Sequence, residues 1–235
     1  MPIASQEAVH RSEAHRFAPA TRIQASFVAA AEKRTLIWLA ERAPGSINSD
    51  HLTILGFVSQ CLAGVCYAIS RLNPDALLLG IVFLALNWLG DSLDGTLARV
   101  RNRQRPRYGF YVDHITDTIA AFFLMGGMAI SGYVHPEIAL GMLVAFLMLS
   151  IESYLATYTL GNFQLSYWRF GPTEIRILLA IGNLALFYHP LIRLGGRSVL
   201  LFDLGGVIAI PAMGLMLIVS SIRHTIQLYR EERIA

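Results

Sequence analysis

The chain contains six apolar blocks, each close to the length that crosses a membrane, and these blocks limit the folds open to it. A hydrocarbon core about 30 Å thick requires roughly 20 apolar residues in a helix, and a helix satisfies its own backbone hydrogen bonds in lipid. The blocks are residues 52–70, 75–98, 111–133, 136–160, 174–190 and 199–223. The sequence therefore predicts an all-α integral membrane protein with six transmembrane helices.

Composition supports a membrane protein over a soluble one. Apolar residues make up 54% of the chain and charged residues 15%, whereas soluble domains carry about 25% charged residues. No basic module with interleaved aromatic residues is present, so nucleic-acid binding is not expected. Cys61 and Cys66 lie five residues apart in an apolar block. They would point in different directions on a helix, so we predict no disulfide between them.

The amino-terminal part differs from the blocks that follow. Residues 1–21 are polar and lack the apolar stretch of a signal peptide, which predicts a mobile cytosolic tail. Residues 22–43 mix apolar and charged side chains, a pattern typical of an amphipathic helix lying in the membrane interface. Residues 44–235 then form one six-helix membrane domain. No internal repeat divides it.

The placement of cationic residues predicts the orientation. Lys and Arg in short loops remain on the cytoplasmic side. With the amino terminus inside, all but three of the 19 cationic residues lie in cytoplasmic segments; the exceptions are Arg71, Arg193 and Arg197. We therefore expect both termini in the cytoplasm of a multi-pass protein, in a bacterial or archaeal inner membrane.

Four aspartates stand at one break between apolar blocks. Asp91 and Asp94 end the second block, and Asp113 and Asp117 begin the third. Spacings of three and four residues place each pair on one helical face. The loop between the blocks is short, which predicts that the two helices are antiparallel neighbours. The four carboxylates should therefore converge near the cytoplasmic edge of the membrane.

Such a cluster requires a cation. An aspartate in a transmembrane helix costs roughly 3 kcal/mol, and neighbouring like charges add to this cost. Oxygen ligands without His or Cys favour Mg²⁺, Mn²⁺ or Ca²⁺ over zinc. A divalent ion with open positions beside the cationic Arg99 is an arrangement that handles phosphate.

The same stretch contains a longer pattern, D-x2-D-G-x2-A-R, then nine residues, then G-x3-D-x3-D. It is similar to the signature of the CDP-alcohol phosphotransferase (CDP-alcohol phosphatidyltransferase) family. Every fixed position is present: Asp91, Asp94, Gly95, Ala98, Arg99, Gly109, Asp113 and Asp117. The six-helix plan and the interfacial helix also look like that family.

The resemblance implies a reaction and roles for these residues. A hydroxyl of an alcohol acceptor would attack the β-phosphorus of a CDP-linked donor, and CMP would leave. Asp91, Asp94 and Asp113 would hold Mg²⁺ or Mn²⁺, while Asp117 would be the general base and could also touch a metal. The CDP moiety would meet the remaining signature residues, with Gly95, Ala98 and Gly109 lining the cytidine pocket and Arg99 at phosphate.

Outside the signature, three residues are further candidates. Thr53 belongs to a partly matching motif at the start of the first block, where Asp50 stands at the position of the family's usual Asn, and Thr53 is a candidate nucleotide contact. Arg169 and Arg176 are candidates for binding the acceptor. The resemblance also suggests a homodimer in a lipid membrane.

The sequence allows more than one pair of donor and acceptor. We favour CDP-diacylglycerol as donor with a small polar alcohol as acceptor, because a lipid pyrophosphate would sit where the carboxylates lie. The alternative is CDP-choline or CDP-ethanolamine with diacylglycerol, which His114 beside Asp113 slightly favours. Two other classes of protein fit the sequence less well. An intramembrane prenyltransferase has more spans than this chain can supply, and a non-enzymatic carrier is expected to contain paired repeats.

Overall fold

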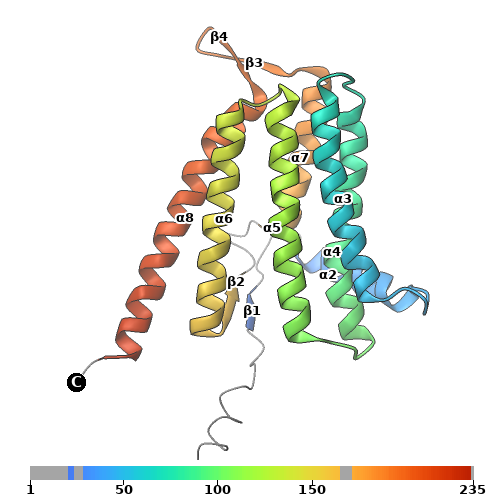
Figure 1. Ribbon diagram of the computed structural model, residues 1–235, viewed down its shortest axis with the longest axis vertical. Coiled ribbons are helices and arrows are strands. Elements are labelled where there is room, and N and C mark those ends of the chain that lie inside the picture. The colour runs from blue at the N-terminus through green and yellow to red at the C-terminus, as the bar shows by residue number, and fades with distance from the viewer. Residues whose placement is uncertain (1–20, 24–28, 165–170, 234–235) are drawn as a thin grey trace, which may run out of the picture.

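The structure is a computed structural model, and it describes residues 21–23, 29–164 and 171–233. The helices in these ranges are α2 (Ala29–Arg42), α3 (Ser49–Ser70), α4 (Ala76–Val100), α5 (Pro106–Ser131), α6 (Pro136–Leu160), α7 (Pro172–Tyr188) and α8 (Leu201–Glu231). Helices α3 to α8 run side by side in a bundle, and α2 lies crosswise at one end (Figure 1). Two short strands, β3 (Leu191–Leu194) and β4 (Arg197–Leu200), form a hairpin at the opposite end.

Five of these helices are long and apolar enough to cross a membrane, namely α3, α4, α5, α6 and α8. The chain is an all-α integral membrane protein, as predicted. Helix α7, expected as a sixth span over 174–190, has 17 residues. At 1.5 Å per residue such a helix is about 26 Å long, a little less than the roughly 30 Å core. A sixth crossing by α7 therefore stays a prediction.

Local signals set the ends of the helices. Asn48 caps α3, because its side chain accepts a hydrogen bond from the His51 amide at 3.0 Å. Helices α5, α6 and α7 each begin at a proline, whose missing amide hydrogen costs nothing in the first turn. Gly132 and Gly161 end α5 and α6 in the left-handed conformation, with φ of 78° and 69°.

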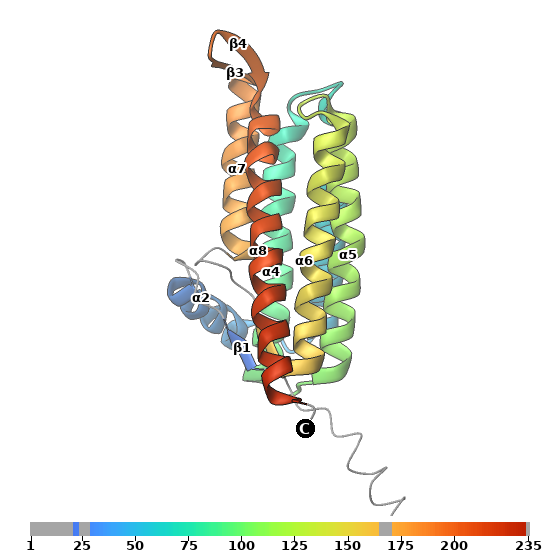
Figure 2. The same ribbon diagram turned by 90° about the vertical axis from the view of Figure 1, so that its left-hand side faces the viewer.

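The amino-terminal helix is shorter than the helix expected over 22–43. Thr21–Ile23 forms strand β1, which pairs in parallel with β2 (Asn162–Gln164), and α2 starts at Ala29. The buried residues of α2 are Glu32, Leu36 and Ala40, spaced four apart on one face. Leu36 and Ala40 on this face share an apolar cluster with Leu93 and Leu97 of α4. Figure 2 shows α2 at the lower end of the bundle. Apart from Thr21, the predicted tail over residues 1–21 lies outside the described residues.

Glycines allow α3 to approach its neighbours closely. A Cβ atom at Gly127 of α5 would lie 1.9 Å from the Gly64 carbonyl oxygen of α3. A Cβ at Gly90 of α4 would lie 2.4 Å from the Gly56 amide nitrogen of α3. Small residues of this kind let membrane helices pack backbone to backbone. Cys61 and Cys66 are both free cysteines, which confirms the prediction of no disulfide between them.

Gly127→Ala is expected to destabilise the protein, because the added methyl group would overlap the backbone of α3. Overpacking of this kind costs about 1–3 kcal/mol, and the thermal unfolding midpoint in detergent measures it. Gly126→Ala is the matched control, since a Cβ there meets nothing within 4 Å. Equal midpoints for the two variants would contradict the close α3–α5 packing.

Candidate active site

Helix α3 joins the two helices that carry the aspartates. It packs extensively against both α4 and α5, whereas direct α4–α5 packing among the described residues is at most slight. The two helices run antiparallel, as predicted, but each packs mainly on α3 rather than directly on the other. The glycines of α3, Gly56 and Gly64, allow it to pack closely against each of them. The space left beside α3 is where the aspartate side chains meet.

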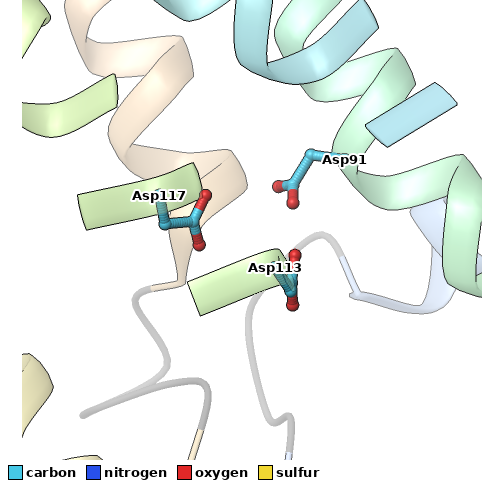
Figure 3. Close-up of side chains that lie close together, drawn as sticks. All are labelled: Asp91, Asp113 and Asp117. Atoms are coloured by element: carbon cyan, nitrogen blue, oxygen red, sulfur yellow. The ribbon is translucent and has the colours of Figure 1, made fainter. Parts of the chain in front are cut away.

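Asp91, Asp113 and Asp117 form one group. Figure 3 shows Asp91 of α4 pointing toward Asp113 and Asp117 of α5. One carboxylate oxygen from each lies within 4.8 Å of the others, and each residue is partly buried. The donors are all carboxylate oxygens, which suit Mg²⁺ or Mn²⁺. The spacing expected from the sequence thus brings together three of the four aspartates.

Asp94 lines the same pocket but is held by other groups. Its Oδ2 accepts a hydrogen bond from Thr53 Oγ1 at 2.7 Å, and its other oxygen accepts one from the amide of Gly95. Thr53 therefore contacts a signature aspartate directly. A role for Asp94 as a metal ligand, and for Thr53 as a nucleotide contact, stays a prediction.

Arg176 of α7 reaches into the aspartate group. Its Nη2 lies 2.5 Å from Asp91 Oδ2, and its Nε donates to Asn87 Oδ1 at 2.7 Å. The Arg176 side chain is 14% exposed, so the ion pair is largely shielded from solvent. This guanidinium is the positive charge that a cluster of carboxylates requires.

Asn87 is a residue of the site that the sequence interpretation did not assign to it. It is buried, and its amide group donates to the Gly56 carbonyl at 3.0 Å and to Gln60 Oε1 at 3.1 Å. These bonds fix the amide so that its oxygen faces Arg176. Asn87 lies four residues before Asp91 and therefore on the same face of α4. This spacing is the sequence signal that could have identified Asn87 as a residue of the site.

One pocket contains all four aspartates. Its lining residues are Thr53, Gly56, Phe57, Gln60, Asn87, Asp91, Asp94, Asp113, Thr116, Asp117 and Ala120. The other signature residues do not line it. Arg99 is exposed and donates to Thr96 Oγ1 at 2.9 Å. A Cβ atom added at Gly109 would meet nothing within 4 Å, so the space there is open. A Cβ atom added at Gly95 would lie 3.5 Å from Arg99 Nη1.

These observations leave several assignments as predictions. Contacts of Gly95, Ala98, Arg99 and Gly109 with a CDP group are not tested by the geometry. Arg169 lies outside the described residues. Arg176 lies at the site, but its partners in the structure are Asp91 and Asn87.

Comparison with protein families agrees with the signature. The family model described as CDP-alcohol phosphatidyltransferase matches residues 47–221, which include α3 to α7, most of α8 and all four aspartates. The chain therefore belongs to the CDP-alcohol phosphatidyltransferase family. It is a multi-span membrane transferase that acts as a CDP-alcohol phosphotransferase. No curated protein matches the chain.

Proposed function

We propose that this enzyme transfers a phosphatidyl group from CDP-diacylglycerol to the hydroxyl of a small polar alcohol, with release of CMP. The observation that carries the proposal is the group of three carboxylates, Asp91, Asp113 and Asp117, set between apolar helices. A lipid donor can place its pyrophosphate there while its acyl chains extend between helices. A soluble acceptor would enter from the end of the bundle where α2 lies.

The residues present fit a divalent metal. Three carboxylate oxygens lie close together beside a charge-compensating arginine, and Asp94 stands one turn further along α4. Asp91, Asp113 and Asp117, with Asp94, would hold Mg²⁺ or Mn²⁺. When bound, such an ion neutralises charge on the pyrophosphate and on the leaving CMP.

The chain's own residues supply orientation and proton transfer. We propose that Asp117 accepts the proton of the acceptor hydroxyl as a general base. The hydroxyl oxygen forms a bond to the β-phosphorus while the bond from that phosphorus to the CMP oxygen breaks. CMP leaves with that oxygen and the bonding electron pair. Apolar side chains from α3 and α5, such as Phe57 and Ala120, line the same pocket and limit competing water.

Arg176 would bind the phosphate of the acceptor if the acceptor carries one. A guanidinium is suited to bidentate binding of phosphate, and Arg176 already lies beside Asp91. Arg169 is the second candidate for the same task. We propose that Arg176 exchanges its carboxylate partner for the acceptor phosphate during the cycle.

His114 gives less support to the alternative donor than the sequence suggested. Its ring is buried and packs edge-on against Phe110 at 4.2 Å and stacks on Tyr154 at 4.6 Å between ring centroids. A ring packed in this way has a structural role in joining α5 to α6. We therefore favour CDP-diacylglycerol over CDP-choline or CDP-ethanolamine as the donor.

Substrate assays separate the two possibilities. Purified enzyme with Mg²⁺ or Mn²⁺ is incubated with CDP-diacylglycerol and a panel of alcohols, some phosphorylated, and separately with CDP-choline or CDP-ethanolamine and diacylglycerol. We expect CMP release in the first set only. Release confined to the second set would refute the proposed donor while leaving the family and the reaction type unchanged.

A further inference from the structure

Glu32 of helix α2 is buried among polar groups of two other helices. It is 9% exposed, and among the described residues its Oε1 accepts hydrogen bonds from side chains of α4 and α7. Trp88 Nε1 and Ser92 Oγ of α4 donate at 2.8 and 3.3 Å, and Thr173 Oγ1 of α7 donates at 2.6 Å. Burying a carboxylate is costly unless it is well hydrogen-bonded, and bonds to a charged acceptor are the strong ones. A single oxygen atom thus ties α2 to both α4 and α7.

The contact with Thr173 lies one helical turn from the aspartate site. Thr173 precedes Arg176 by three residues in the first turns of α7, and Arg176 reaches Asp91 and Asn87. The opposite half of α7 is held separately, because Asn183 Oδ1 accepts a hydrogen bond from the Tyr67 hydroxyl at 2.6 Å. The start of α7 is therefore fixed by Glu32 on one side and by the aspartate site on the other.

From this arrangement we infer that Glu32, acting through Thr173, is a positioning residue that holds Arg176 against Asp91. The inference rests on the proposed metal site. A guanidinium beside Asp91 competes with a divalent ion for the same carboxylate. When the start of α7 is less firmly held, Arg176 engages Asp91 less well, and the aspartate group attracts a metal ion more strongly. Helix α2 thereby sets the metal affinity of the site.

Mn²⁺ binding to the purified full-length protein without substrate tests this link. The free ion is followed by electron paramagnetic resonance, so the result does not depend on turnover. Arg176→Gln is expected to tighten binding about tenfold, because the competing cation is removed. Thr173→Val removes the hydroxyl at nearly constant volume and is expected to tighten binding about threefold. Thr173→Ser retains the hydroxyl and should restore the wild-type affinity.

The double variant decides whether Thr173 acts through Arg176. Thr173→Val combined with Arg176→Gln should bind Mn²⁺ as tightly as Arg176→Gln alone. Tyr67→Phe is the matched control, since it removes a hydrogen bond of the same length at the other end of α7. It should lower the thermal midpoint and leave Mn²⁺ affinity unchanged.

Three outcomes would overturn the inference. The first is a threefold effect of Thr173→Val that persists in the Arg176→Gln background, and the second is an equal shift in Tyr67→Phe. The third is wild-type affinity in Thr173→Val. A wild-type protein that fails to bind Mn²⁺ would instead overturn the proposed metal site, and the inference with it.

Discussion

Replacing Asp91 with Asn is expected to abolish CMP release, with a loss of about a thousandfold or more. Asp91 belongs to the group of three carboxylates and is also the partner of Arg176. The amide that replaces it carries no charge, so it is a poor ligand for a hard divalent ion and leaves Arg176 without its counter-charge. Turnover and Mn²⁺ affinity should fall together, which assays of CMP release and metal titration measure.

Asp75→Asn provides the control for this experiment. Asp75 is an exposed carboxylate at the other end of the same helix, and its side chain does not cap α4. Asp75→Asn removes one negative charge, as Asp91→Asn does. It should nevertheless leave turnover within about twofold of wild type, as is usual for surface positions. Near-normal turnover in Asp91→Asn would contradict the role of the carboxylate group in the reaction.

Asp117→Asn is expected to reduce the chemical step by about a thousandfold while the donor still binds. Asn cannot accept the proton of the acceptor hydroxyl, whereas Asp91 and Asp113 keep their negative charges for the metal. Single-turnover CMP formation and equilibrium binding of the CDP-linked donor separate the two effects. The chemical rate should fall far more than donor affinity.

The geometry makes this test informative, because Asp117 lies with Asp91 and Asp113 whereas Asp94 is bonded to Thr53. If Asp117→Asn weakened donor binding as completely as Asp91→Asn, Asp117 would be mainly a metal ligand and the assignment as base would be wrong. Thr53→Val then gives a useful comparison. It removes the hydrogen bond from Thr53 to Asp94 without altering the three grouped carboxylates.

Much of the fold could be predicted from the sequence because its causes are local. Apolar blocks near the length of a bilayer crossing specify helices whatever their neighbours are, and five of the six expected spans are present as long apolar helices. The spacing of Asp113 and Asp117 places both on one face of α5 by helical geometry alone. The fixed positions of the signature led to the family that the comparison confirms.

The partners of the polar side chains could be seen only in the tertiary structure. The sequence predicted four carboxylates converging from neighbouring helices, and all four line one pocket. It did not predict that α4 and α5 would each pack mainly on α3, or that Thr53 would bind Asp94. Asn87 and Arg176 meet across 89 positions of sequence, and Glu32 and Thr173 across 141. Helical periodicity fixes which face of its own helix a residue occupies. Which helix faces it depends on close packing at small residues such as Gly56 and Gly90, and that is a property of the assembled bundle.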